Sequence, residues 1–132
     1  MAEVLKAVNV VTVFVHDLQR SKGFYERVFD ITAADEDEGS AIFKLDNLFL
    51  RLLTRSEAEK EMLGNVPVAD PDSGASFKLA MFVDDLDARC AKLAERGVSI
   101  FGPVDRPWGV RNAASQDSDG HVWVFSADSP DS

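Results

Sequence analysis

Few side chains in this sequence are of the kinds that do acid–base or nucleophilic chemistry. It holds two histidines, His16 and His121, and a single cysteine, Cys90. His16 stands between a predicted strand and a predicted helix, and His121 follows an Asp-Gly turn, so we interpret both as surface or turn residues. Cys90 is expected to pack in a helix as a small apolar residue. Asp117 and Asp119 are explained by the turn they form, and no Ser-His-Asp or Cys-His motif is apparent.

Two cations interrupt otherwise apolar strands. Arg51 alternates with leucines in one predicted strand, and Lys78 alternates with apolar residues in another. A buried cation is costly unless it is paired. Each therefore indicates either an anionic or carbonyl-bearing ligand, or an ion pair with this acidic chain, or a side chain that reaches water past a strand end.

The strands that carry these cations are apolar on both faces. In the runs 8–15, 77–83 and 121–125, both alternate sets of side chains are mostly apolar. One face of each sheet must pack on helices. No further layer of sequence is left to cover the other face, so that face predicts a small-molecule cavity or an interface with another subunit. Both alternatives remain open at this point.

These strands belong to a unit that occurs twice. Residues 13–18 read Val-Phe-Val-His-Asp-Leu, and residues 81–86 read Met-Phe-Val-Asp-Asp-Leu. An apolar run precedes each copy and a helical pattern follows it, which predicts two copies of one structural unit. Each half is predicted to be β-α-β-β-β, giving an α+β fold of two tandem modules with curved sheets and helices on their outer face.

A length of 132 residues fits one domain. Within residues 1–132 we expect the first module at 6–55, a connecting helix and linker at 56–76, the second module at 77–127 and a loose tail at 128–132.

The helices are predicted from their caps and apolar spacing. Asp17 is the expected N-cap of a helix over 18–29, which Asp30 ends, and Asp85 is the expected N-cap of a helix over 86–96, which Gly97 ends. Other expected elements are a solvated acidic turn at 35–39, a hairpin of strands 41–45 and 48–53, a capping-box helix from Ser56 to about Leu63, a strand at 98–101, and a hairpin of strands 111–116 and 121–125.

Composition excludes some partners. The net charge is −9, so a nucleic-acid phosphate backbone would be repelled. No apolar run is long enough to span a membrane, and the first residues do not form a signal peptide. One cysteine allows no disulfide within the chain, and a cytoplasmic location is the expectation.

The repeated motif and four further segments resemble the vicinal oxygen chelate superfamily, which includes glyoxalase I, bleomycin-resistance proteins, fosfomycin-resistance enzymes and ring-cleaving dioxygenases. The matching segments are Ser21-Lys22-Gly23-Phe24-Tyr25, Glu95-Arg96-Gly97-Val98, Trp108-Gly109-Val110-Arg111 and Asp117-Ser118-Asp119-Gly120-His121. The resemblance spans nearly the whole chain and implies the glyoxalase/bleomycin-resistance fold. It implies less about function, because the fold hosts several chemistries.

The resemblance also implies where a metal would be bound. Metal enzymes of the family carry a ligand five residues before the valine of each Val-x-Asp motif, and a Glu or His in the last strand of each module. Here those positions are Val10, Lys78, Arg51 and Val124. Valine has no lone pair and a cation repels a divalent ion, so we expect no metal and no other cofactor.

The residues expected to line the ligand site lie on the uncovered faces and in the Pro-Trp-Gly loop. They are Val10, Thr12, Phe14, Phe49, Arg51, Lys78, Phe82, Trp108 and Val124. In the resemblance, loops like that of Trp108 overhang the cavity, where a tryptophan could stack on a flat ligand. A hydrophobic plug for the loop is the alternative role of Trp108.

We therefore expect a metal-independent homodimeric protein that sequesters an apolar or aromatic natural product or metabolite, of the antibiotic-resistance type, without catalysis. One alternative is a metal-dependent lyase, isomerase or dioxygenase of the same superfamily. A second alternative is a dimeric interaction protein that binds no ligand.

Overall fold

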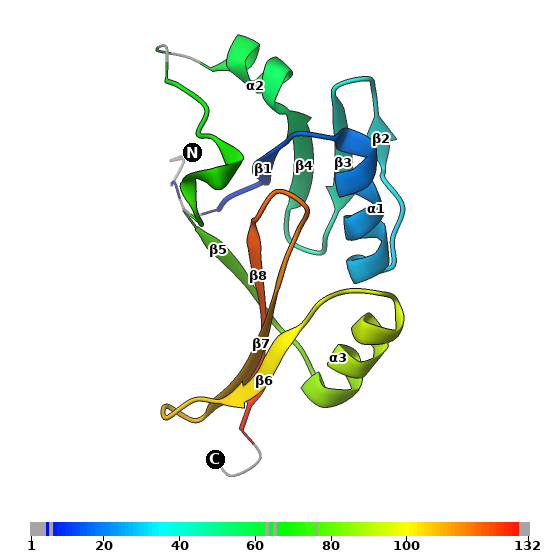
Figure 1. Ribbon diagram of the computed structural model, residues 1–132, viewed down its shortest axis with the longest axis vertical. Coiled ribbons are helices and arrows are strands. Elements are labelled where there is room, and N and C mark those ends of the chain that lie inside the picture. The colour runs from blue at the N-terminus through cyan, green and yellow to red at the C-terminus, as the bar shows by residue number, and fades with distance from the viewer. Residues whose placement is uncertain (1–4, 6, 63, 65, 76, 130–132) are drawn as a thin grey trace, which may run out of the picture.

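The computed structural model describes residues 5, 7–62, 64, 66–75 and 77–129. Its strands form two four-stranded sheets, each accompanied by one long helix. The two units follow one another along the long axis of the molecule, with α1 (Leu18–Phe29) and α3 (Leu86–Glu95) on the same side (Figure 1). This is the α+β arrangement of two βαβββ modules that the repeat predicts.

The first module holds one parallel and two antiparallel strand pairs. Its strands are β1 (Val10–Val15), β2 (Asp35–Glu36), β3 (Ser40–Lys44) and β4 (Phe49–Thr54). They lie in the order β1-β4-β3-β2, with β1 parallel to β4. The Leu45 amide donates to the Leu48 carbonyl at 2.9 Å and closes the predicted tight turn between β3 and β4. The acidic run is only partly a turn, because Asp35 and Glu36 pair with β3 as the short strand β2.

The second module repeats this plan. Its strands are β5 (Lys78–Phe82), β6 (Phe101–Asp105), β7 (Val110–Gln116) and β8 (Val122–Asp128). They lie in the order β5-β8-β7-β6, with β5 parallel to β8 and the remaining pairs antiparallel. In both modules the first strand therefore lies at a sheet edge, beside the last strand.

Helix α1 begins and ends where its sequence predicts. The Asp17 carboxylate accepts a hydrogen bond from the Arg20 amide at 3.2 Å, as an N-cap does. Asp30 adopts a left-handed backbone with φ 56° and ends the helix, as a short polar residue can. The buried face includes Phe24 and Tyr25, which pack towards the sheet.

Asp85 is the N-cap residue of α3, as predicted, but it makes no capping hydrogen bond, and the predicted cap of the connecting helix is wrong. Asp85 has a left-handed backbone with φ 47° and makes no capping hydrogen bond, because the capping geometry needs an extended backbone at that residue. The connecting helix α2 (Arg55–Glu61) is capped by Thr54, whose hydroxyl accepts from the Glu57 amide, rather than by Ser56. The predicted end of this helix at Leu63 lies outside the described residues.

A short 3-10 helix, η2 (Pro71–Ser73), follows in the connecting segment. None of the helices among the described residues is long and apolar enough to cross a membrane.

Two strand boundaries also differ from the prediction. The strand expected at 98–101 is β6 and lies at 101–105, including Gly102 and Pro103. A proline is tolerated there because β6 is an edge strand of its sheet. Strand β8 continues to Asp128, which pairs with Val110, so the tail expected at 128–132 begins later; residues 130–132 lie outside the described part.

Both modules contribute to one buried core on the helix-bearing side of their sheets. The ring of Trp123 on β8 lies 5.9 Å from that of Tyr25 and 5.0 Å from that of Phe29, both on α1. Arg96, which follows α3, donates to the Arg27 carbonyl of α1 at 3.0 Å. Cys90 is buried in the same core, as predicted. The two modules are thus packed through their helix sides, which leaves the opposite sheet faces uncovered by α1 and α3.

Two valines of β1 test which face is the core. Val13 is 1 % exposed and Val10 is 48 % exposed. Val13→Ala should lower the free energy of unfolding by about 2 kcal/mol, through lost burial and a residual cavity. Val10→Ala should cost under about 0.5 kcal/mol. Urea denaturation of both variants measures this, and an equal cost would contradict the assignment of the two faces.

Candidate functional site

The face of the first sheet opposite α1, which we call open face one, carries five of the predicted site residues. Val10 pairs with Phe49 and Thr12 pairs with Arg51 across β1 and β4, and Phe14 is the next residue of β1 on the same side. Phe49 is 41 % exposed and Val10 is likewise exposed, although both are large apolar side chains. The strand register thus brings these five residues onto one surface.

The helix-free face of the second module, open face two, carries three more. Lys78, Ala80 and Phe82 alternate along β5, and Val124 lies beside Ala80 on β8. Phe82 is 89 % exposed, whereas Val124 is buried among its neighbours. A phenylalanine that exposed on a sheet face marks a surface suited to bind another apolar surface or molecule.

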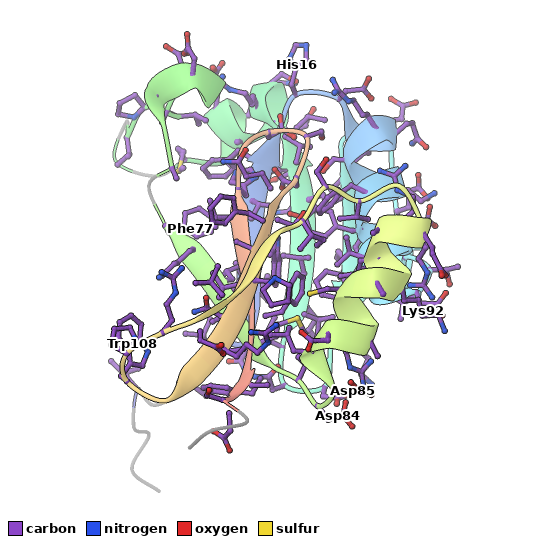
Figure 2. All side chains as sticks on the ribbon, turned by 60° about the horizontal axis from the view of Figure 1, so that its bottom comes forward. His16, Phe77, Asp84, Asp85, Lys92 and Trp108 are labelled. Atoms are coloured by element: carbon purple, nitrogen blue, oxygen red, sulfur yellow. The ribbon has the colours of Figure 1, made fainter. Side chains whose placement is uncertain are left out.

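Trp108 lies apart from these residues. It belongs to the turn between β6 and β7, where the Arg106 amide donates to the Val110 carbonyl at 2.7 Å. Its side chain is 67 % exposed, and Figure 2 shows it at the end of that hairpin, away from Phe77. The structure therefore gives Trp108 no role as a plug for its own loop.

Of the three roles considered for Arg51, the structure shows an ion pair within the chain. Its guanidinium donates two hydrogen bonds to the Glu61 carboxylate, at 3.0 and 2.9 Å. These hydrogen bonds lower the pKa of Glu61 and raise the pKa of Arg51 from their ordinary values. A cation already held in this two-pronged geometry by α2 is less available to an anionic ligand.

Lys78 differs from Arg51. Within the described part of the chain, no hydrogen bond or ion pair of its ammonium group is found, and the residue is exposed on open face two. It therefore provides a cation beside an apolar surface, able to contact a polar group of a ligand.

The residues at the positions of the family's metal ligands do not fit a metal ion. Val10 and Val124 carry no donor atom, Lys78 is cationic, and Arg51 is paired with Glu61. Among the described residues, no group of three or more His, Cys, Asp or Glu side chains is placed to hold a metal. Divalent ions need several such donors, so these four positions do not form a metal site.

A cavity of about 380 Å³ lies where the two modules meet, and we call it the seam cavity. Its walls come from residues 12–14 of β1, from the connecting segment between Met62 and Ala75, and from Phe77 and the turn 119–121. Thr12 and Phe14 are thus shared with open face one. Lys78, Phe82 and Val124 are not among its walls, so one chain does not bring all nine predicted residues into one cavity.

A buried carboxylate lies at the back of the turn beside this cavity. The Asp117 side chain is fully buried and accepts hydrogen bonds from the Tyr25 hydroxyl and from Nδ1 of His121, the latter at 2.8 Å. Its other oxygen accepts from the amides of Asp119 and His121, each at 2.9 Å. The indole of Trp123 donates to the Tyr25 hydroxyl at 3.1 Å. This network joins α1 of the first module to the β7–β8 turn of the second.

The network shifts the pKa values of its members. Burial by itself disfavours the charged form of Asp117, but the hydrogen bonds from His121 and Tyr25 outweigh it and hold the pKa of Asp117 below its ordinary value. Burial similarly opposes protonation of His121, yet the Asp117 carboxylate raises the pKa of His121 above 6.5. Burial and the negative charge of Asp117 both raise the pKa of Tyr25.

The sequence comparison agrees with this architecture. Residues 7–125 match the model of the Glyoxalase/Bleomycin resistance protein/Dioxygenase superfamily. The chain belongs to this superfamily. A comparison with curated protein sequences gave no match.

Solved structures include several similar chains. TnmS3, an antibiotic binding protein from Streptomyces sp. CB03234, is 28 % identical with a TM-score of 0.70, over 97 % of this chain and 100 % of that one. A glyoxalase/bleomycin resistance protein/dioxygenase from Nocardioides is 22 % identical with a TM-score of 0.82, over 99 % and 89 %. Lactoylglutathione lyase from Agrobacterium tumefaciens is 17 % identical with a TM-score of 0.73, over 92 % of each chain. The last two likenesses show the fold alone.

The sequence does not predict that Asp117 joins the two modules through hydrogen bonds; it explains this residue only by the turn that it forms. That explanation is correct for the oxygen that accepts two turn amides. The second oxygen accepts a hydrogen bond from the Tyr25 hydroxyl, 92 residues away along the chain. The sequence feature that could have indicated this hydrogen bond is Tyr25, because a tyrosine on a buried helix face needs a partner for its hydroxyl.

The variant Tyr25→Phe measures how much the hydrogen bond from Tyr25 to Asp117 contributes to stability. The substitution removes a donor to a buried carboxylate and should lower the free energy of unfolding by about 2 kcal/mol. Ser21→Ala is the matched control, because the Ser21 hydroxyl on the same helix is buried without a hydrogen-bond partner among the described residues. That control should be neutral or stabilising. Equal losses in the two variants would show that Tyr25 contributes only by filling space.

The Asp117–His121 pair should also make stability depend on pH. Since the pKa of His121 is raised in the folded state, its contribution is complete only well below the ordinary histidine pKa of 6.5 and is lost as the pH rises through the folded-state pKa. The charged and titratable groups facing it are Asp117 and Asp119, with Tyr25 behind Asp117. The stability difference between wild type and His121→Gln should thus shrink from pH 6 to pH 9. Urea denaturation across this range tests it, and a difference that grows with pH would contradict the pairing.

Proposed function

We propose that this protein binds a small, mostly apolar aromatic molecule on its open faces without a metal ion, and that it sequesters this molecule rather than transforming it. The observation that carries the proposal is that the open faces combine exposed apolar side chains with an absence of metal-binding side chains at the expected positions. Large apolar side chains such as Phe49 and Phe82 are exposed there, while the positions of the family's metal ligands carry valine or a cation. A ligand surface with few polar groups suits an apolar molecule.

The likeness to TnmS3 supports this function. That protein is described as an antibiotic binding protein, and the two chains match over nearly their whole lengths. By analogy, a natural product is the class of ligand that we propose for this chain. Lys78, which has no ion pair among the described residues, would contact a carboxylate, quinone or phenol oxygen of that molecule.

We also propose that the protein acts as a homodimer. Each module has an apolar open face, and the walls of the seam cavity within one chain do not include Lys78, Phe82 or Val124. A second copy could place open face one opposite open face two and enclose the ligand between them. The free edges of β1 and β5 offer further backbone groups for such a contact. A cytoplasmic location remains our expectation.

An enzyme of the same superfamily is the alternative, and the likeness of fold to lactoylglutathione lyase is the observation that favours it. Elemental analysis of protein purified without chelator separates the two functions. Stoichiometric, tightly bound zinc, nickel, manganese or iron would contradict metal-independent binding.

A thermal-shift screen with naphthoquinones, anthraquinones and flavonoids tests the proposed function. A compound that binds the folded protein alone must raise its melting temperature. We expect a saturable rise for at least one of these classes. Its absence for all of them would favour the other alternative, a dimer whose open faces bind each other and no ligand.

Phe82→Ala then locates the site. The variant should weaken binding of the best compound at least tenfold, because an exposed aromatic wall is lost, while the melting temperature without ligand stays nearly unchanged. Lys92→Ala, which changes an exposed side chain of α3, is the matched control. Equal affinity in the Phe82→Ala and Lys92→Ala variants would remove Phe82 from the site.

A further inference from the structure

The seam cavity combines an apolar wall with a fixed imidazole. Phe14 from β1 and Phe77 from the entry to β5 both line it, and the ring of Phe77 lies 5.6 Å from that of His121. Met62 and Val66 of the connecting segment add further apolar surface. The cavity volume of about 380 Å³ falls near the lower end of the range for small-molecule sites, which suits a ligand of one ring.

The charged groups in these walls are mostly paired with protein groups. Arg55 contacts the Asp70 carboxylate at 3.3 Å and donates to the Val68 carbonyl at 3.3 Å. One carboxylate oxygen of Asp119 accepts from the His16 amide at 2.9 Å. These groups hold the connecting segment and the β7–β8 turn in place around the cavity.

His121 is different because only one of its ring nitrogens is used. Nδ1 is bound to Asp117, which fixes the plane of the ring, and no partner of Nε2 is found among the described residues. The side chain is largely buried yet lines the cavity. A carboxylate-oriented imidazole with one nitrogen open to a cavity is a prepared hydrogen-bonding group.

We propose that the seam cavity is a second small-molecule site, within a single chain, that binds a one-ring phenol through a hydrogen bond between the phenol hydroxyl and Nε2 of His121. The aromatic ring of the phenol lies between Phe14 and Phe77. This site is distinct from open face two, whose residues Lys78, Phe82 and Val124 do not line it.

A hydroxyl fits this nitrogen better than a carboxylate or an amine does. Neutral His121 accepts through Nε2, and protonated His121 donates through it. A phenol hydroxyl both donates and accepts, so it is matched in either state. A carboxylate would meet the nearby Asp117 and Asp119 charges, and an ammonium would be repelled by protonated His121.

Titration with phenol and with anisole, followed by NMR of the imidazole nitrogens, tests this site on the intact protein. The chain has two histidines, so His16, which is exposed, serves as the internal control. Phenol should shift the His121 Nε2 signal saturably and leave the His16 signals unchanged. At a pH above the folded-state pKa of His121, where Nε2 accepts a hydrogen bond, anisole, which has the same ring but cannot donate a proton, should bind at least tenfold more weakly. Equal affinities, or equal shifts of both histidines, would overturn the proposal.

Three variants separate this site from open face two. His121→Gln should reduce phenol affinity to that of anisole, and Phe77→Leu, which leaves the Asp117 network intact, should weaken both probes. Phe82→Ala on open face two should leave the phenol titration as in wild type. If His121→Gln does not fold, Phe77→Leu decides: unchanged phenol affinity in that variant overturns the seam site. Loss of phenol binding in Phe82→Ala alone would place the phenol on the open face and would also overturn it.

Discussion

The structure depends on one buried carboxylate. Asp117 accepts hydrogen bonds from a helix of the first module and from its own turn in the second, in a region from which water is excluded. A buried charge is stable only when its hydrogen bonds are complete. The network therefore fixes the relative position of the modules, with Tyr25 and Trp123 in contact behind it. Because the modules pack through their helix sides, the other sheet faces remain free for function.

The helix side and the open faces of the sheets contribute differently to stability. The helix side holds the core and the Asp117 network, so the residues of the open faces carry little of the stability. Val10 and Val124 stand at positions where the resemblance to the superfamily implies metal ligands, and folding requires no polar group at either position. Arg51 at a third such position is also compatible with folding, because the Glu61 carboxylate of α2 neutralises its charge within the chain. What the open faces retain is an apolar, aromatic surface beside which Lys78 provides a cation without an ion pair among the described residues.

Much of the fold was predictable because local signals and the repeat agree. Asp17 and Asp30 bound α1 as expected, and the strand pattern predicted both open faces. Errors arose where tertiary context overrode local chemistry, as at Asp85, whose left-handed backbone removes its capping bond, and at β6, where an edge position tolerates Pro103. The seam cavity could not be predicted, because it joins three parts of the chain that are more than forty residues apart and whose side chains, taken locally, indicate only linker and turn.

The central claim is that the open faces bind an aromatic ligand where relatives bind a metal. The most direct measurement is a set of nuclear Overhauser contacts between the ring protons of the best compound from the thermal-shift screen and the labelled methyl groups of the valines. The account predicts contacts from Val10 and Val124, which stand at two of the metal-ligand positions, and none from Val13 in the core. Contacts to valines elsewhere, with none from Val10 or Val124 in a saturated complex, would contradict it.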